Sequence, residues 1–60
     1  MNDNIEQKSA LVVDDSRTQR DYLKALLEEQ GYRVYTANDG QAGVDMFRRC
    51  QPDIILMDIM

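Results

Sequence analysis

The sequence predicts an α/β protein in which strands and helices alternate in the order βαβαβ. Two apolar runs, 10–13 and 54–57, are short, rich in branched residues and typical of strands that are buried on both faces. Between them, on either side of a strand-like segment at 33–37, lie two stretches with apolar residues at helical spacing. With short connections throughout, this alternation indicates a parallel sheet with right-handed crossovers and helices packed on it.

The first half of the chain contains a strand, a helix and the signals that bound the helix. The strand covers 10–13, and Ser16 can cap a helix that begins at Arg17. We expect this helix to run to Gln30, because Gly31 supplies the left-handed residue that commonly ends a helix. The apolar positions of the helix recur every three or four residues and predict one buried face; they are Tyr22, Leu23, Leu26 and Leu27.

The second half repeats the pattern and adds a last strand. Alternating residues at 33–37 predict an edge strand. A turn follows, in which Asn38 or Asp39 is available to cap the next helix. That helix spans 41–50, and the third strand covers 54–58.

Size and composition limit what the chain can be. It has 60 residues, 43% of them hydrophobic, which suits a globular chain of marginal stability. Cys50 is the only cysteine and histidine is absent, which excludes a disulfide framework and a Cys/His metal cluster. The net charge of −4 argues against direct nucleic-acid binding, and no apolar stretch is long enough to span a bilayer. We therefore expect a cytoplasmic protein with a solvated polar tail at 1–8 and one domain at 9–60.

Three aspartates follow the first and last apolar runs: Asp14 and Asp15 after the first, and Asp58 after the last. In open α/β sheets, ligands bind beyond the carboxyl ends of the strands. The carboxylates would therefore line one crevice if those two strands are adjacent. A hard divalent cation such as Mg2+ relieves the repulsion among them. A carboxylate beside such an ion can attack a phosphoryl group and form an acyl phosphate.

Three motifs, in this order, resemble the receiver domain of two-component response regulators. They are LVVDDS at 11–16, ANDG at 37–40 and PDIILMDIM at 52–60. The likeness covers 9–60 and implies a flavodoxin-like doubly wound sheet, here limited to its βαβαβ half in the strand order 2-1-3. It also implies a signalling module, and not an enzyme, that takes a phosphoryl group from a histidine kinase or phosphotransfer protein.

The resemblance also implies roles for particular residues and for one cofactor, Mg2+. Asp58 would be the phosphoacceptor and also a ligand of the metal, and Asp15 would bind Mg2+ directly. Asp14 would bind the metal more loosely, through water. The main-chain carbonyl of Met60 would complete the protein ligands.

The likeness stops before the receiver pattern is complete. A receiver has five βα units, whereas this chain ends in the loop after its third strand. The family's later hydroxyl and lysine residues, which contact the phosphoryl group, are missing, so we expect phosphoacceptor function to be impaired in this truncated receiver domain. We also expect the third strand to be exposed or paired with another chain, because an apolar open edge favours self-association.

Two other interpretations stay open. The chain can be a structural or self-associating fragment with an idle acidic pocket. A hydrolase of the haloacid-dehalogenase type also uses a strand-end aspartate with Mg2+, but it has a second acid two positions later, where this chain has Met60.

Other residues have structural interpretations. Asp39 is interpreted as a cap, and Asp53 as the start of the third strand. Cys50 is expected to be a small buried hydrophobe, and Gly43 to allow close approach of helix and sheet.

Overall fold

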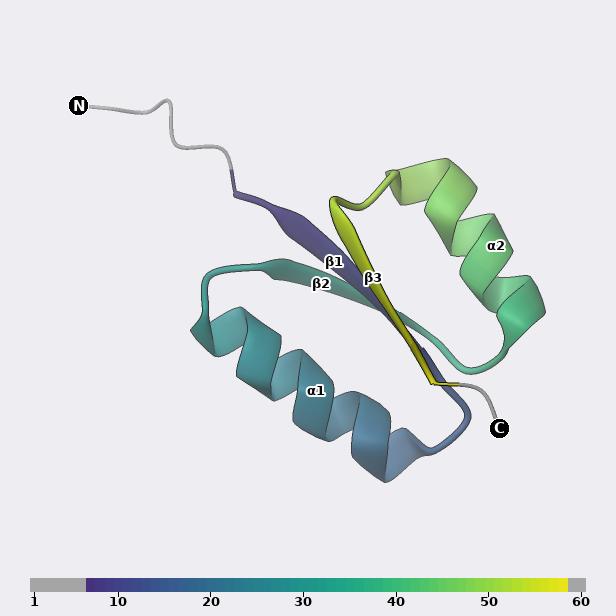
Figure 1. Cartoon of the computed structure of the whole chain (residues 1–60), viewed down its shortest axis with the longest axis horizontal. Coiled ribbons are helices and arrows are strands. Elements are labelled where there is room, and N and C mark those ends of the chain that lie inside the picture. The colour runs from purple at the N-terminus through teal and green to yellow at the C-terminus, as the bar shows by residue number, and fades with distance from the viewer. Residues whose placement is uncertain (1–6, 59–60) are drawn as a thin grey trace.

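The computed structural model describes residues 7–58 and contains the predicted βαβαβ order (Figure 1). The ends of each element differ from the expected ones by no more than one residue. The elements are β1 (Ser9–Asp14), α1 (Arg17–Glu29), β2 (Arg33–Ala37), α2 (Gly40–Cys50) and β3 (Ile54–Asp58).

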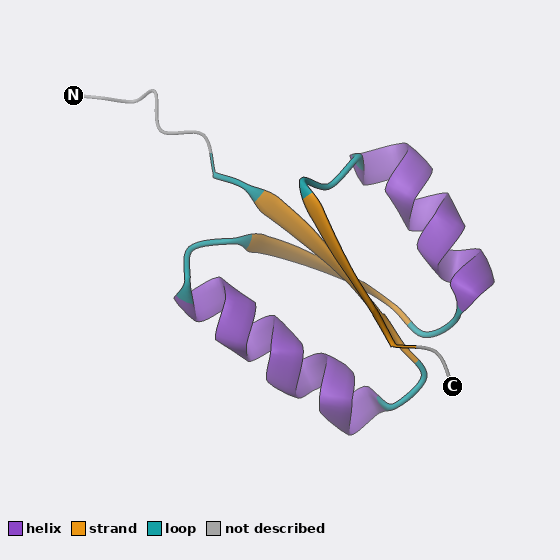
Figure 2. Cartoon of the chain, in the orientation of Figure 1, coloured by secondary structure: helices purple, strands orange, loops and turns teal. Residues whose placement is uncertain are grey.

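The strands form one parallel sheet in the order β2-β1-β3, as predicted for half of a flavodoxin-like fold. β1 lies in the centre, where Val13 is the register partner of both Ala37 on β2 and Met57 on β3. Figure 2 shows α1 on one side of the sheet and α2 on the other, which gives three layers. Because all strands run in the same direction, their carboxyl ends meet at one edge of the sheet.

β1 forms the core of the molecule because both of its faces are covered. Its apolar residues are at most 1% exposed; they are Ala10, Leu11, Val12 and Val13. Full burial of a valine or leucine side chain contributes roughly 1.5–3 kcal/mol, so this short strand supplies a large part of the stabilising burial. On the α2 side, Ala37 of β2 joins Leu11 and Val13, and Met46 of α2 packs against them.

Both helices begin at capping residues that the sequence offers. The Ser16 hydroxyl accepts a hydrogen bond from the Gln19 N–H at 3.3 Å. Asp39 Oδ1 accepts one from the Ala42 N–H at 2.8 Å, which decides between the two predicted caps of α2. α1 ends before Gly31, whose φ of 97° lies in the region that favours glycine. In the part of the chain from 7 to 58, neither helix has the length and apolar content needed to cross a membrane.

α2 approaches the sheet closely at Gly43, as the sequence predicts. A methyl group at this position would lie 2.9 Å from Val13 Cγ2 and 3.3 Å from Val13 Cγ1. Side chains almost never show the shorter of these distances, so glycine is what lets α2 lie this near to β1. Val13 is fully buried, and its side chain occupies the space that a larger residue at 43 would need.

β3 is the least covered strand. Both helices pack on β1 and β2, and neither packs on β3 within the described residues. Ile55, Leu56 and Met57 are therefore 41%, 37% and 56% exposed. The outer edge of β3 also has no strand beside it among residues 7–58, which agrees with the predicted exposure of this strand.

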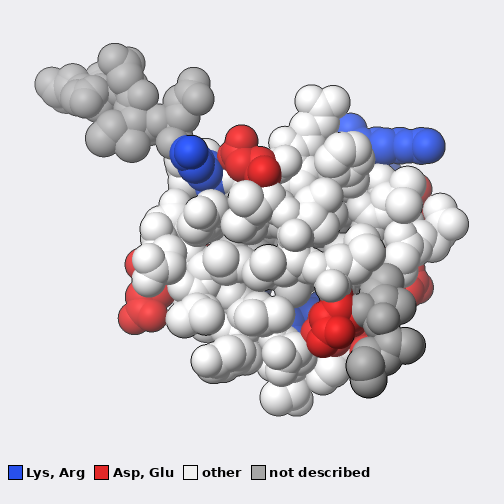
Figure 3. All heavy atoms as spheres, in the orientation of Figure 1, with Lys and Arg blue, Asp and Glu red and all other residues white. Residues whose placement is uncertain are grey.

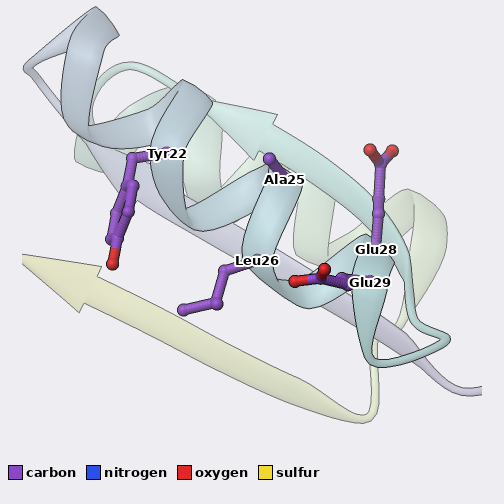
Figure 4. A pocket seen from close by; sticks show the side chains of 5 residues that line it. All are labelled: Tyr22, Ala25, Leu26, Glu28 and Glu29. Atoms are coloured by element: carbon purple, nitrogen blue, oxygen red, sulfur yellow. The ribbon is translucent and has the colours of Figure 1, made fainter.

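The predicted buried face of α1 forms only in part. Leu23 and Leu27 are half-buried. Tyr22 and Leu26 are 62% and 43% exposed, so for these two residues the prediction of burial is wrong. Figure 4 shows Tyr22 and Leu26 extending from α1 on the side where β3 lies, in a groove that they help to line. Because no helix packs on β3, this part of the apolar stripe has little to pack against.

Gly43→Ala is expected to destabilise the protein by up to about 2 kcal/mol net, because overpacking usually costs about 1–3 kcal/mol. The new methyl group would press on Val13, and this cost exceeds the roughly 1 kcal/mol that alanine gains over glycine in helix propensity. Urea unfolding followed by circular dichroism measures the change. In a Val13→Ala background, which makes room for the methyl group, the same substitution should be neutral or stabilising. A Gly43→Ala protein as stable as wild type would show that the close approach matters little.

Candidate functional site

The carboxyl edge of the sheet carries the aspartates that the sequence singles out. Asp14 and Asp58 are register partners at the ends of β1 and β3, so the parallel pairing puts them side by side. Asp15 follows directly after β1, in the turn that leads to α1. The predicted site depends on the first and third strands being neighbours, and this is confirmed.

Asp14 is the one buried charged side chain among residues 7–58, with 3% exposure. Its Oδ1 accepts a hydrogen bond from the Ser16 N–H at 2.9 Å. Its Oδ2 is buried and has no hydrogen-bond partner. A buried polar group without a partner costs about 1–3 kcal/mol, and more when it is charged. β1 therefore holds a carboxylate oxygen where a cation beside it would be favourable.

Asp15 and Asp58 lie at the surface, in contrast to Asp14. In the orientation of Figure 1, Figure 3 shows acidic atoms gathered where β3 ends, with a small group of basic atoms next to them. We call the group of Asp14, Asp15 and Asp58 the acidic edge. Within it, Asp14 is buried and Asp58 is open to solvent. A reactant from solution therefore has open access to Asp58, whereas Asp14 exposes 3% of its surface.

Arg20 also lies at this edge, although no motif in the sequence points to it. Its Nη1 donates a hydrogen bond to the main-chain carbonyl of Asp14 at 2.8 Å, and its side chain is half-buried. The sequence does place it near the start of α1, next to the end of β1. No sequence pattern indicates the contact itself, because the acceptor is a main-chain atom that any residue type would offer at that position.

The residues at this edge fit a divalent cation in part. The unpartnered Asp14 Oδ2 and the neighbouring Asp58 are hard oxygen donors of the kind that Mg2+ takes. Among residues 7–58, however, no three or more Asp, Glu, His or Cys side chains form a group that could hold a metal ion. Met60, the predicted carbonyl ligand, lies outside the described residues. The ligand set of Asp14, Asp15, Asp58 and Met60 therefore stays a prediction.

The other residues weighed in the sequence lie away from the acidic edge. Asp39 caps α2. Asp53 lies at the opposite edge of the sheet, where its Oδ2 accepts a hydrogen bond from the Ser9 N–H at 2.8 Å. Cys50 was expected to be buried, but it is only half-buried. Its Sγ lies 3.5 Å from Met46 Sδ on the same helix. Its partial exposure follows from its position in the last turn of α2.

Comparison with known families agrees with this geometry. The chain matches the Response regulator receiver domain over residues 10–60. This match covers most of the chain, which therefore belongs to the response regulator receiver domain family. Members of this family are signalling modules with a phosphoacceptor role in two-component systems. No solved structure matches the chain.

In the absence of metal, Asp14→Asn is expected to raise the free energy of unfolding by about 1 kcal/mol, because it removes an unpartnered buried charge. The asparagine Oδ1 can still accept the hydrogen bond from the Ser16 N–H. Chemical unfolding in a buffer that contains a chelator measures the difference.

Asp15→Asn is the matched control, because it removes the same charge from the adjacent, exposed position. Its stability should stay close to that of the wild type. If Asp14→Asn were clearly less stable than wild type without metal, the buried carboxylate would have to be compensated within the fold, and it would not favour a cation beside it.

Proposed function

We propose that Asp58 accepts a phosphoryl group from a histidine kinase or phosphotransfer protein, with Mg2+ bound at the acidic edge. The family supports this class of reaction, and Asp58 is the acid that ends β3. A net charge of −4 fits a protein partner better than a nucleic acid. The free thiol of Cys50 fits a reducing compartment, so the proposal includes a cytoplasmic location.

The observation that carries the proposal is the register pair of one buried and one exposed acid. A phosphoacceptor must be reached by its donor, and Asp58 is exposed. An oxygen that takes part in cation binding, directly or through water, must have no competing partner, and Asp14 Oδ2 has none. Because Asp14 and Asp58 are adjacent across two hydrogen-bonded strands, a cation held by one would lie near the other.

The proposed transfer forms one bond and breaks one. A carboxylate oxygen of Asp58 attacks the phosphorus of a phosphohistidine. The P–N bond breaks, and its electron pair stays on the imidazole nitrogen. The products are an acyl phosphate on Asp58 and a neutral histidine, once the proton balance of the imidazole has been restored from solvent. The contribution of the chain is to present Asp58 at the exposed end of β3.

The same proposal assigns the metal ligands. Asp15 and Asp58 would bind Mg2+ directly and Asp14 through water, together with the main-chain carbonyl of Met60. When bound, the ion would neutralise charge on the phosphoryl oxygens. Without it, Asp14 and Asp15 would repel an incoming phosphoryl group, so the phosphoacceptor role and the metal site stand together.

Mg2+ and beryllium fluoride, an analogue of an acyl phosphate, are expected to bind together and to shift the amide NMR signals around Asp58. Asp58→Asn should abolish this joint response, because the acceptor oxygen is lost. Asp45→Asn is the matched control, since Asp45 is an exposed acid on α2 outside the acidic edge. It should respond like the wild type. Unchanged spectra of the wild-type chain with both additives would overturn the proposal for this chain.

One observation favours a second function, that of a self-associating or structural module. β3 is apolar, is exposed on both faces, and has no strand beside its outer edge among residues 7–58. Such an edge is a template for pairing with another chain. In this alternative, copies of the chain associate through β3, and the acidic edge plays no part.

Leu56→Lys is expected to weaken self-association, because a charged side chain on an edge strand opposes strand pairing. Sedimentation velocity over a range of concentrations should show a shift toward larger species for wild type and a smaller shift for the variant. Gln41→Lys makes the same change of charge on the exposed surface of α2 and should behave like wild type. A wild-type chain that stays a folded monomer at all concentrations would contradict this alternative.

A further inference from the structure

The peptide group between Asp14 and Asp15 is held by a side chain from α1. Arg20 Nη1 donates to the Asp14 carbonyl at 2.8 Å, and the arginine is half-buried where it does so. The contact lies where sheet pairing on one side has ended, because the β1–β2 register stops at Val13 and Ala37. The guanidinium of Arg20 thus contacts the main chain of β1 at a position that is no longer paired with β2.

Three contacts together leave Asp14 little freedom. Its main chain is in register with Asp58, its Oδ1 accepts from the Ser16 N–H, and its carbonyl accepts from Arg20. The carbonyl of Asp14 and the N–H of Asp15 belong to one planar peptide group. Arg20 therefore also restrains the direction in which the chain, and with it the exposed Asp15 side chain, leaves β1.

We propose that Arg20 is a positioning residue, which orients the carboxylates of Asp14 and Asp15 by holding the peptide group between them. This inference rests on the proposed function, in which these carboxylates bind a divalent cation. In this proposal Arg20 acts through the two acids, because the contact that the structure gives its guanidinium is with the Asp14 carbonyl. Groups that orient a metal ligand typically change metal affinity by about 10- to 100-fold when they are removed.

The charge of Arg20 makes the proposal sharply testable. A positive side chain near a cation site disfavours the cation, so a purely electrostatic role predicts that removing Arg20 tightens Mg2+ binding. A positioning role predicts the opposite, because the acids lose their orientation. Arg17 provides the comparison: it lies on the same first turn of α1, its side chain is 85% exposed, and it pairs with Asp21 at 3.8 Å.

Mg2+ titration followed by amide NMR of the folded chain separates the two roles. For Arg20→Met we expect binding that is about 10-fold weaker than for wild type. Arg17→Met loses the same charge and should bind as tightly as wild type or slightly tighter. Arg20→Lys keeps the charge and one donor and should lie between wild type and Arg20→Met. Binding by Arg20→Met that equals or exceeds that of the wild type would overturn the inference while leaving the proposed function intact.

A second measurement, made without metal, tests the role of Arg20 independently of the proposed function. The carbonyl carbon of Asp14 and the amide of Asp15 should shift in Arg20→Met and stay in place in Arg17→Met, because only Arg20 holds that peptide group. If wild type binds no Mg2+, the proposed function fails, and these shifts alone decide whether Arg20 orients the two acids. Identical signals in wild type and Arg20→Met would overturn the positioning role.

Discussion

The parallel pairing of β1 with β3 is the constraint on which the rest of the structure depends. It joins two segments from opposite ends of the described chain and makes Asp14 and Asp58 neighbours. It also puts β1 in the centre of the sheet, where helices on opposite sides bury both faces of the strand. A slip of one residue in this pairing would turn every side chain of β3 to the other face, and Asp58 would no longer be the register partner of Asp14.

β1, which forms the core, ends in the carboxylate of Asp14, and burying a charged group is unfavourable. Asp14 is as buried as the apolar residues before it, yet one of its carboxylate oxygens has no partner. Ser16 and Arg20 stabilise its other oxygen and its carbonyl, and they leave the remaining oxygen available. If the proposed cation site exists, this arrangement lowers the stability of the metal-free fold and offers the cation an oxygen that no other group engages.

Stability is unevenly distributed across the sheet. β1 is packed on both faces, whereas β3 carries exposed apolar residues on both. The strand that bears Asp58 is thus held mainly by its ladder to β1 and by the contact of Asp53 with Ser9 at the other edge. The phosphoacceptor candidate therefore lies on the least covered element, where a partner of either kind, a second copy of the chain or a phosphoryl donor, would have access to it.

Local patterns in the sequence were enough to predict every strand and helix, the cap Ser16 and the left-handed Gly31, because each depends on neighbouring residues. They left the cap of α2 open between Asn38 and Asp39, and the strand order was predicted from the resemblance to receiver domains. The acids of the candidate site could be named for the same reason. The burial of Asp14, the exposure of Tyr22 and Leu26 and the contact of Arg20 with a carbonyl were decided only by the tertiary structure. Periodicity tells which side chains share a face, but whether that face is covered depends on which distant segments pack on it.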